Sequence, residues 1–297
     1  KLINQVVLID YTIIILGGMS MRKEGVVWKI FNALVIVMGL LLILGPVWVI
    51  FINSMKTMQE AGQDFFALPS RLNFDNYVEL FTRSDFWSSL RNSVIVTVSS
   101  VALVVIFVPA LAYAVARNME KRYYKILYYY ILAGIFIPFQ VLMLPMVKQM
   151  TQMKMLNQTG LILLHLTFSL STGLFLFVNY IRSLPTEIEE AARVDGCNVF
   201  QTYIRIVIHL IKPMVATIIV MDSLGCWNNF MMALLILNKN HNMWTLPLMQ
   251  YNFKAEYSFN YTMAFTSYIV CMIPIIIVYA LGQKYIIKGL TAGAVKS

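Results

Sequence analysis

Six long runs of apolar residues constrain the fold of this chain more than any other feature of its sequence. They cover approximately residues 26–55, 87–116, 124–147, 161–181, 213–237 and 261–287. A helix of about 20 mostly apolar residues can cross the hydrocarbon core of a bilayer. Only 12% of the residues are charged and 59% are hydrophobic, so too few polar side chains exist to cover a water-soluble domain. The sequence therefore predicts an all-α integral membrane protein with six transmembrane helices.

The basic residues predict how these helices are oriented. Lysine and arginine accumulate in the cytoplasmic connections of membrane proteins. Here they concentrate at residues 117–125, at 182–212 and beyond 284, at the ends of apolar runs. This pattern explains the formal charge of +9 without a nucleic-acid partner, because no dense basic cluster with interleaved aromatic residues is present. We expect a multi-pass protein of a cell membrane with both termini in the cytoplasm.

The chain is expected to divide into four segments. Residues 1–20 are expected to be a translated leader or a disordered arm, since Gly17-Gly18 can be encoded by a ribosome-binding sequence just before Met21. A short membrane-associated arm is the alternative. Residues 21–85 hold the first transmembrane helix and a polar extracellular loop with short helices. Residues 86–288 form the core membrane domain with its polar loop 182–213, and residues 289–297 form a cytoplasmic tail.

The polar loop between the fourth and fifth apolar runs carries the strongest local signals. Pro185 suits the first helical position, and the acidic residues that follow suit the first turns of a helix. Gly196 accepts the left-handed conformation of a helix end, and Asn198 can cap the next helix. The loop is therefore predicted to form two short helices at the cytoplasmic surface. We interpret them as a docking element, with a re-entrant loop that has no partner as the alternative.

The same loop resembles a known motif. Glu190-Ala191-Ala192, three further residues and Gly196 match the EAA loop of binding-protein-dependent ABC importer permeases, and Ile206 fits the end of that pattern. Ile208-His209 stands where the family has Leu-Pro. The segments Trp227-Asn228-Asn229-Phe230 and 288–296 resemble the carbohydrate permeases of the maltose type, specifically the second, maltose-G-like subunit. The resemblance covers residues 21–297.

This resemblance implies a permease fold with cytoplasmic EAA coupling helices and a defined set of partners. The chain would pair with a second homologous permease over two ATPase subunits, and an extracellular solute-binding protein would deliver the sugar or oligosaccharide. The EAA loop would dock on the ATPase and couple ATP hydrolysis to transport. The residues implied in this coupling are Glu190, Ala191, Ala192, Asp195 and Gly196.

Polar residues inside the apolar runs are candidates for the translocation path, because an ionisable group at membrane depth is costly. Asp222 is the clear example, and Asn228 and Asn229 follow it on the same run. A carboxylate and amides can bond to sugar hydroxyl groups. Gln140 is expected to line the same cavity. The alternative for these residues is hydrogen bonding between helices that holds the spans together.

Several other functions are disfavoured. The three cysteines are scattered without CxxC spacing, and His165 and His209 have no carboxylate at ligand spacing, so we expect no metal or cofactor and interpret both histidines as structural. The chain has no P-loop, so a partner must hydrolyse ATP, and it has no GxSxG or HExxH motif for a membrane-integral enzyme. A permease for a non-sugar solute and a purely structural subunit remain alternatives. The sequence leaves open both a neutral oligosaccharide such as raffinose and an anionic one.

Overall fold

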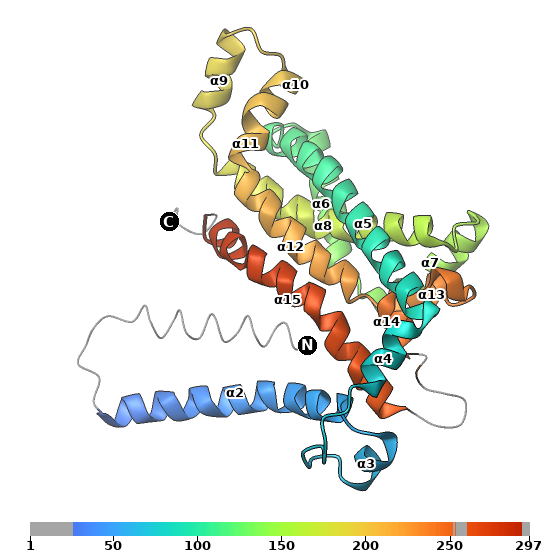
Figure 1. Cartoon of the computed structure of the whole chain (residues 1–297). Helices are drawn as coiled ribbons and strands as arrows, with labels where there is room; N and C mark the ends of the chain where they lie inside the picture. Colours follow the sequence, from blue (N-terminus) through green and yellow to red (C-terminus); the bar gives the residue numbers. More distant parts are fainter. Residues whose placement is uncertain (1–25, 252, 254–259, 293–297) are drawn as a thin grey trace. The chain divides into compact units, whose positions relative to one another are not determined.

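The computed structural model describes residues 26–251, 253 and 260–292, and helices make up most of them (Figure 1). The expected leader at residues 1–20 and the end of the expected tail, residues 293–297, lie outside the described residues. The chain forms two compact units. One comprises residues up to Thr82 together with 253–270, and the other comprises residues 83–252 together with the chain from Cys271 onward.

The first unit contains the long helix α2 (Val26–Ser54) and two short helices, α3 (Met58–Gln63) and α4 (Asp75–Thr82). The short helices confirm the predicted structured loop. Lys56, which is fully buried, donates a hydrogen bond of 2.9 Å from Nζ to the carbonyl oxygen of Asp64 and so holds the loop on itself. Thr266, near the start of α15 (Tyr261–Ala292), donates to the carbonyl oxygen of Ser54 at 3.2 Å.

The second unit is built around α5 (Ser84–Arg117), which packs along α8 (Gln158–Arg182) and α12 (Lys212–Trp227). Figure 1 shows these three helices side by side. Their buried side chains form one hydrophobic core, in which Val108, Leu174 and Phe177 are fully buried. Helix α5 approaches α8 closely at Gly173, since a Cβ there would lie 3.0 Å from a methyl group of Val108.

Four helices are long and apolar enough to cross a membrane, and two bent helix pairs raise the number of spans to six when each pair is counted once. The four are α2, α5, α8 and α15. One bent pair, 122–136 with 139–152, turns by 107°, and the other, 199–210 with 212–227, turns by 72°. The described residues thus agree with the six-span all-α fold predicted from the sequence, with two spans broken.

The first bend lies at Pro138, which interrupts the apolar run predicted at 124–147. Helix α6 (Arg122–Ala133) continues into the 3₁₀ turn η1 (Gly134–Phe136), and α7 (Phe139–Gln152) begins after the proline. Ile137 has an extended backbone, with φ −86° and ψ 116°, which is the conformation that a following proline favours.

The fifth apolar run is also divided. Helix α12 ends at Trp227, and α13 (Met231–Leu237) starts after Asn228, Asn229 and Phe230. The side-chain oxygen of Asn229 accepts the backbone N–H of Met232 at 2.9 Å, which satisfies a donor at the start of α13. The turn η3 (His241–Met243) and helix α14 (Leu246–Tyr251) follow. Asn92 of α5 holds this region by donating to the carbonyl oxygens of Asn242 and Trp244.

Candidate functional site

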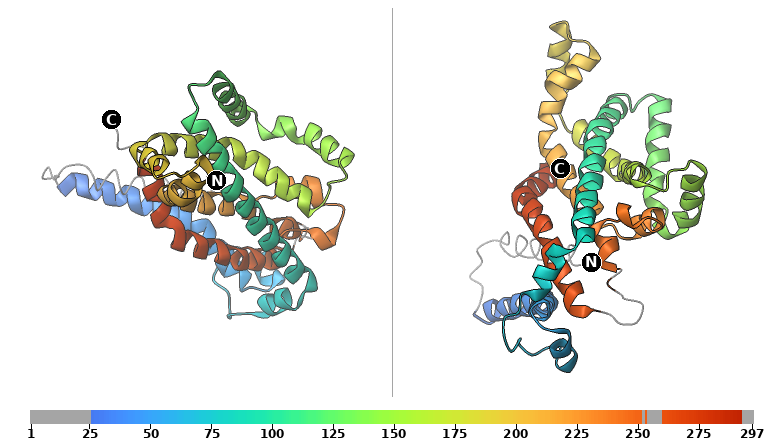
Figure 2. Two further views of the ribbon diagram at one scale, coloured as in Figure 1. Left: turned by 90° about the horizontal axis from the view of Figure 1, so that it is seen from above. Right: turned by 45° about the vertical axis from the view of Figure 1, so that its right-hand side comes forward.

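The loop that joins α8 to α12 forms a helical hairpin that protrudes from the second unit (Figure 2, right-hand view, yellow and gold). It consists of α9 (Glu187–Val194) and α10 (Val199–Thr202), followed by the π-helical segment η2 (Tyr203–Val207) and α11 (Ile208–Leu210). The two short helices predicted from the sequence are confirmed. Pro185, however, lies two residues before α9 rather than at its first position, because the helix starts only after Thr186.

Gly196 ends α9 in the left-handed conformation, with φ +85°. The N–H of Gly196 donates to the carbonyl oxygen of Arg193 at 3.0 Å, and the N–H of Cys197 donates to that of Ala192 at 2.9 Å. These two bonds are the Schellman arrangement, which satisfies carbonyl groups left open at a helix end. The spacing between Ala192 and Gly196 is therefore the spacing that this type of helix end requires.

The second helix of the hairpin starts with a capping box. The side chain of Asn198 accepts the N–H of Gln201 at 2.9 Å, and the side chain of Gln201 accepts the N–H of Asn198 at 2.9 Å. This confirms Asn198 as the cap and fixes the direction in which α10 leaves the turn. The π-helical turn that follows holds one residue more per turn than an α-helix, a distortion often found at functional sites.

A buried ion pair attaches the hairpin to the membrane core. Glu189 is 2% exposed, and one of its carboxylate oxygens accepts hydrogen bonds from Arg117 Nη2 at 2.6 Å and Nε at 2.9 Å. The other oxygen accepts a hydrogen bond of 2.9 Å from Tyr113, whose ring stacks on that of Tyr203. Sequence reasoning placed Glu189 among the acids of the first turn and missed this role. Its i, i+3 spacing to buried Ala192 was the available signal.

The opposite face of the hairpin is exposed and mixes acidic with apolar side chains. Of the residues implied in coupling, Glu190, Ala191 and Asp195 are exposed, whereas the side chain of Ala192 is buried. Val194 is 88% exposed and Phe200 is 70% exposed. A rigid, thin helix with such side chains has the surface expected of an element that is covered by another protein.

A cavity of about 250 Å³ lies between α8 and α12 and contains Asp222 and Asn229 from the predicted path. Helix α8 contributes His165, Ser169 and Thr172, spaced so that they share one helix face. Ser169 donates a hydrogen bond of 3.2 Å to one carboxyl oxygen of Asp222. Cys226 also lines the cavity, as its position one turn after Asp222 predicts.

Two residues of the predicted path lie elsewhere. Gln140 is exposed on α7 and is not among the residues that line this cavity, so its place on the translocation path stays a prediction. The bend at Pro138 turns this part of the chain away from the straight course assumed for the third span. Asn228 is also absent from the lining, and its amide donates to the carbonyl oxygen of Leu224 in its own helix. His165, interpreted as structural, lines the cavity together with Asp222.

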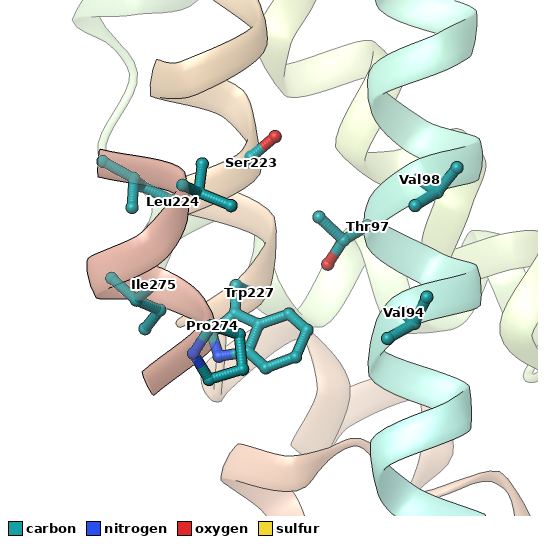
Figure 3. A pocket seen from close by; sticks show the side chains of 9 residues that line it. Val94, Thr97, Val98, Ser223, Leu224, Trp227, Pro274 and Ile275 are labelled. Atoms are coloured by element: carbon teal, nitrogen blue, oxygen red, sulfur yellow. The ribbon is translucent and has the colours of Figure 1, made fainter. Parts of the chain in front are cut away.

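A second cavity of about 160 Å³ lies between α5, α12 and the later part of α15 (Figure 3). Its lining is mainly aliphatic, with Val94 and Val98 on one side, Leu224 and Pro274 on the other, and the ring of Trp227 at one end. The indole N–H donates to the carbonyl oxygen of Cys271 at 3.3 Å. This donor is already used, whereas the hydroxyl of Thr97, which also lines the cavity, is buried without a hydrogen-bond partner among the described residues.

Sequence comparison relates the chain to membrane transport proteins. The model of the family "Binding-protein-dependent transport system inner membrane component" matches residues 106–292. MsmG, the "multiple sugar-binding transport system permease protein" of Streptococcus mutans, is 42% identical over 281 residues, covering 93% of this chain and 100% of that protein. AmyC of Thermoanaerobacterium thermosulfurigenes, a "probable starch degradation products transport system permease protein", is 33% identical and covers the same shares.

Comparison with solved structures also relates the chain to membrane transport proteins. A chain of a bacterial ABC transporter involved in the import of the acidic polysaccharide alginate superposes with a TM-score of 0.78 at 25% sequence identity. The match covers 90% of this chain and 99% of that chain. A chain from the alginate transporter in complex with an alginate-bound periplasmic protein superposes with a TM-score of 0.65 at 15% identity, which supports the fold alone.

Proposed function

The chain belongs to the family of binding-protein-dependent transport system inner membrane components, and we propose that it carries sugars through the membrane as one permease subunit of an ATP-driven importer. Its relatives are permeases, so the chain is a transport subunit and not an enzyme. The names of the relatives support a carbohydrate substrate: MsmG serves a multiple sugar-binding transport system and AmyC a transport system for starch degradation products.

The hairpin of α9 and α10 is the proposed attachment point for a separate ATPase. The observation that carries this proposal is the combination of an exposed outer face with a buried inner anchor. Glu190, Val194 and Phe200 are free for contact, while Glu189 is bonded to Arg117 of α5. A force applied to the outer face would therefore reach a membrane helix through a rigid connection. Glu190, Ala191, Ala192, Asp195 and Gly196 together form the coupling element.

The proposed assembly contains a second homologous permease, two ATPase subunits and an extracellular solute-binding protein. It lies in a bacterial cell membrane, with both termini of this chain and the hairpin on the cytoplasmic side. The concentration of basic residues in the segments next to the hairpin supports this orientation. The polar loop with α3 and α4 then faces outward, where a binding protein would dock.

Crosslinking from the hairpin tests this function. Ala191→Cys places a thiol on the exposed face of α9, and the full complex is purified in mild detergent, crosslinked and identified by mass spectrometry. We expect an ATPase joined at position 191, a second permease in the same preparation, and ATP hydrolysis that a sugar-loaded binding protein stimulates. Both Ala191→Cys and the control Asn179→Cys on α8 are made in a Cys197→Ser background, because Cys197 is a free thiol of the hairpin itself. The control should give no ATPase adduct. Recovery of the chain without an ATPase, either crosslinked or co-purified, would contradict the proposal.

A further inference from the structure

The cavity between α8 and α12 contains two buried polar atoms whose bonding is incomplete. Within the described residues, the second carboxyl oxygen of Asp222 and Nε2 of His165 have no hydrogen-bond partner. His165 is only 5% exposed, and both residues line the cavity. An unsatisfied buried polar group is unfavourable, so two of them in one cavity indicate a site that is completed by something it binds.

The lining has the composition of a site for a sugar ring. The carboxyl group of Asp222, the imidazole of His165 and the amide of Asn229 offer donors and acceptors for hydroxyl groups, and Ser169 and Thr172 add hydroxyl groups of their own. Three apolar side chains cover the rest, namely Phe168, Met221 and Met232. A sugar ring presents hydroxyl groups at its edge and C–H groups on its face, so it matches both kinds of surface.

We propose that this cavity binds one ring of a neutral sugar during transport, with ring hydroxyl groups bonded to Asp222 and His165. This inference rests on the proposed function of the chain as a sugar permease. It also names the substrate class. The lining contains a carboxyl group and neither lysine nor arginine. A uronic acid would bring a second carboxylate next to Asp222 without a cation in the lining to balance it, which is unfavourable because like charges repel.

The selectivity inferred for this cavity differs from that of the solved importer of similar fold. That transporter is involved in the import of an acidic polysaccharide, alginate. In this chain, the carboxyl group of Asp222 and the imidazole of His165 line the cavity. The hydroxyl groups of a neutral ring can form hydrogen bonds with both without adding charge. A shared fold therefore leaves room for different substrate charges, since selectivity depends on the side chains that line the path.

Gly225 offers a direct way to fill the cavity. It lies on the cavity wall between Asp222 and Asn229, and a Cβ built on it would meet no atom within 4 Å. A larger side chain at this position would therefore enter open space rather than collide with the fold. Gly39 of α2 has the same free surroundings but lies in the first unit, so Gly39→Leu is the matched control.

The experiment measures sugar uptake per ATP hydrolysed by the complete importer in proteoliposomes, with raffinose, melibiose and maltotriose as probes. We expect Gly225→Leu to lower this ratio at least tenfold for the sugar that the wild type carries, and Asp222→Leu to lower it to a similar extent. Gly39→Leu should stay within twofold of the wild type. An unchanged ratio in Gly225→Leu would overturn the cavity as a sugar site while leaving the importer intact.

Thiol protection provides a second measurement that is independent of the binding protein. Thr172 lines the cavity and is exposed, so the modification of Thr172→Cys by a small thiol reagent is followed in a Cys197→Ser/Cys226→Ala/Cys271→Ala background. Raffinose should slow the modification at least threefold, trigalacturonic acid should not, and Asp222→Asn should abolish the protection. Equal protection by both sugars would overturn the inferred neutrality. A wild-type complex that takes up none of the neutral sugars would overturn the proposed function and the cavity with it.

Discussion

Arg117 and Glu189 lie 72 positions apart in the sequence and form an ion pair of 2.6 Å that joins membrane helix α5 to helix α9 of the hairpin. The exposed fractions of their side chains are 14% and 2%. Tyr113 completes the arrangement by donating to the second carboxylate oxygen. Both carboxylate oxygens of Glu189 are thereby bonded from α5, so this contact ties α9 to the membrane helix.

Removing one partner of this pair should loosen the hairpin. Glu189→Ala leaves the guanidinium of Arg117 and the hydroxyl of Tyr113 unpaired near the core, which costs about 3–5 kcal/mol in comparable buried pairs. We expect faster hydrogen–deuterium exchange across residues 184–198 in the purified complex and a lower yield of transport per ATP. Glu120→Ala, which removes an exposed acid after α5, is the control. Unchanged exchange in Glu189→Ala would refute this role.

A substitution at Gly196 gives a separate prediction, because proline cannot adopt the φ of +85° that this residue has. Proline holds φ near −65°, so Gly196→Pro would break the turn between α9 and α10. We expect a subunit that still inserts and assembles but shows ATP hydrolysis without sugar uptake. Gly196→Asn should retain most of the uptake, since asparagine tolerates the left-handed conformation. Normal uptake by the proline variant would count against the docking assignment.

The role of the charge on Glu190, the exposed acidic residue of α9, can be tested without altering the fold. Glu190→Lys reverses a charge on the outer face of α9, where it makes no contact with the core. We expect at least a tenfold loss of uptake and of ATPase recovered with the permease, because like charges replace complementary ones at the contact. Glu120→Lys makes the same change on a neighbouring connection. If both variants behave alike, the effect is one of net charge and not of docking.

The loop of the first unit that contains α3 should respond to acid. Hydrogen bonds from Ser70, whose backbone N–H lies 2.6 Å from the carboxylate, hold the pKa of Glu60 below its ordinary value of 4.5. The stabilisation is present above that ordinary value and is lost as the pH falls through the lowered pKa of the folded loop. The Glu60→Gln variant should therefore differ from the wild type in Tm at neutral pH, and the difference should shrink in acid.

A titration of Glu60 followed by the ¹³C signal of its carboxyl group measures this pKa directly. A midpoint at or above 4.5 would contradict the folded-loop assignment. Asp64 provides an internal comparison, because backbone N–H groups of Ala67 and Phe66 likewise hold its pKa below its ordinary value of 3.8. Both carboxylates lie outside the membrane-spanning helices, so water reaches them at every pH used.

The parts of this structure that local chemistry controls could be predicted from the sequence. The cap at Asn198 and the helix end at Gly196 involve residues no more than five positions apart, so the local sequence is enough to predict both. The bond between Ser169 and Asp222 spans 53 positions, and neither residue indicates its partner. Pro138 marks a bend, but the turn of 107° depends on how the flanking helices pack.

The two walls of the polar cavity, α8 and α12, are joined in the chain by the segment that forms the hairpin. Helix α8 ends at Arg182, the hairpin follows, and α12 begins at Lys212, so the hairpin is the covalent link between the wall with His165 and the wall with Asp222. If the hairpin docks on an ATPase as proposed, a displacement of the hairpin would be transmitted along the chain to both walls. The same connection would then change the distance between His165 and Asp222 across the cavity.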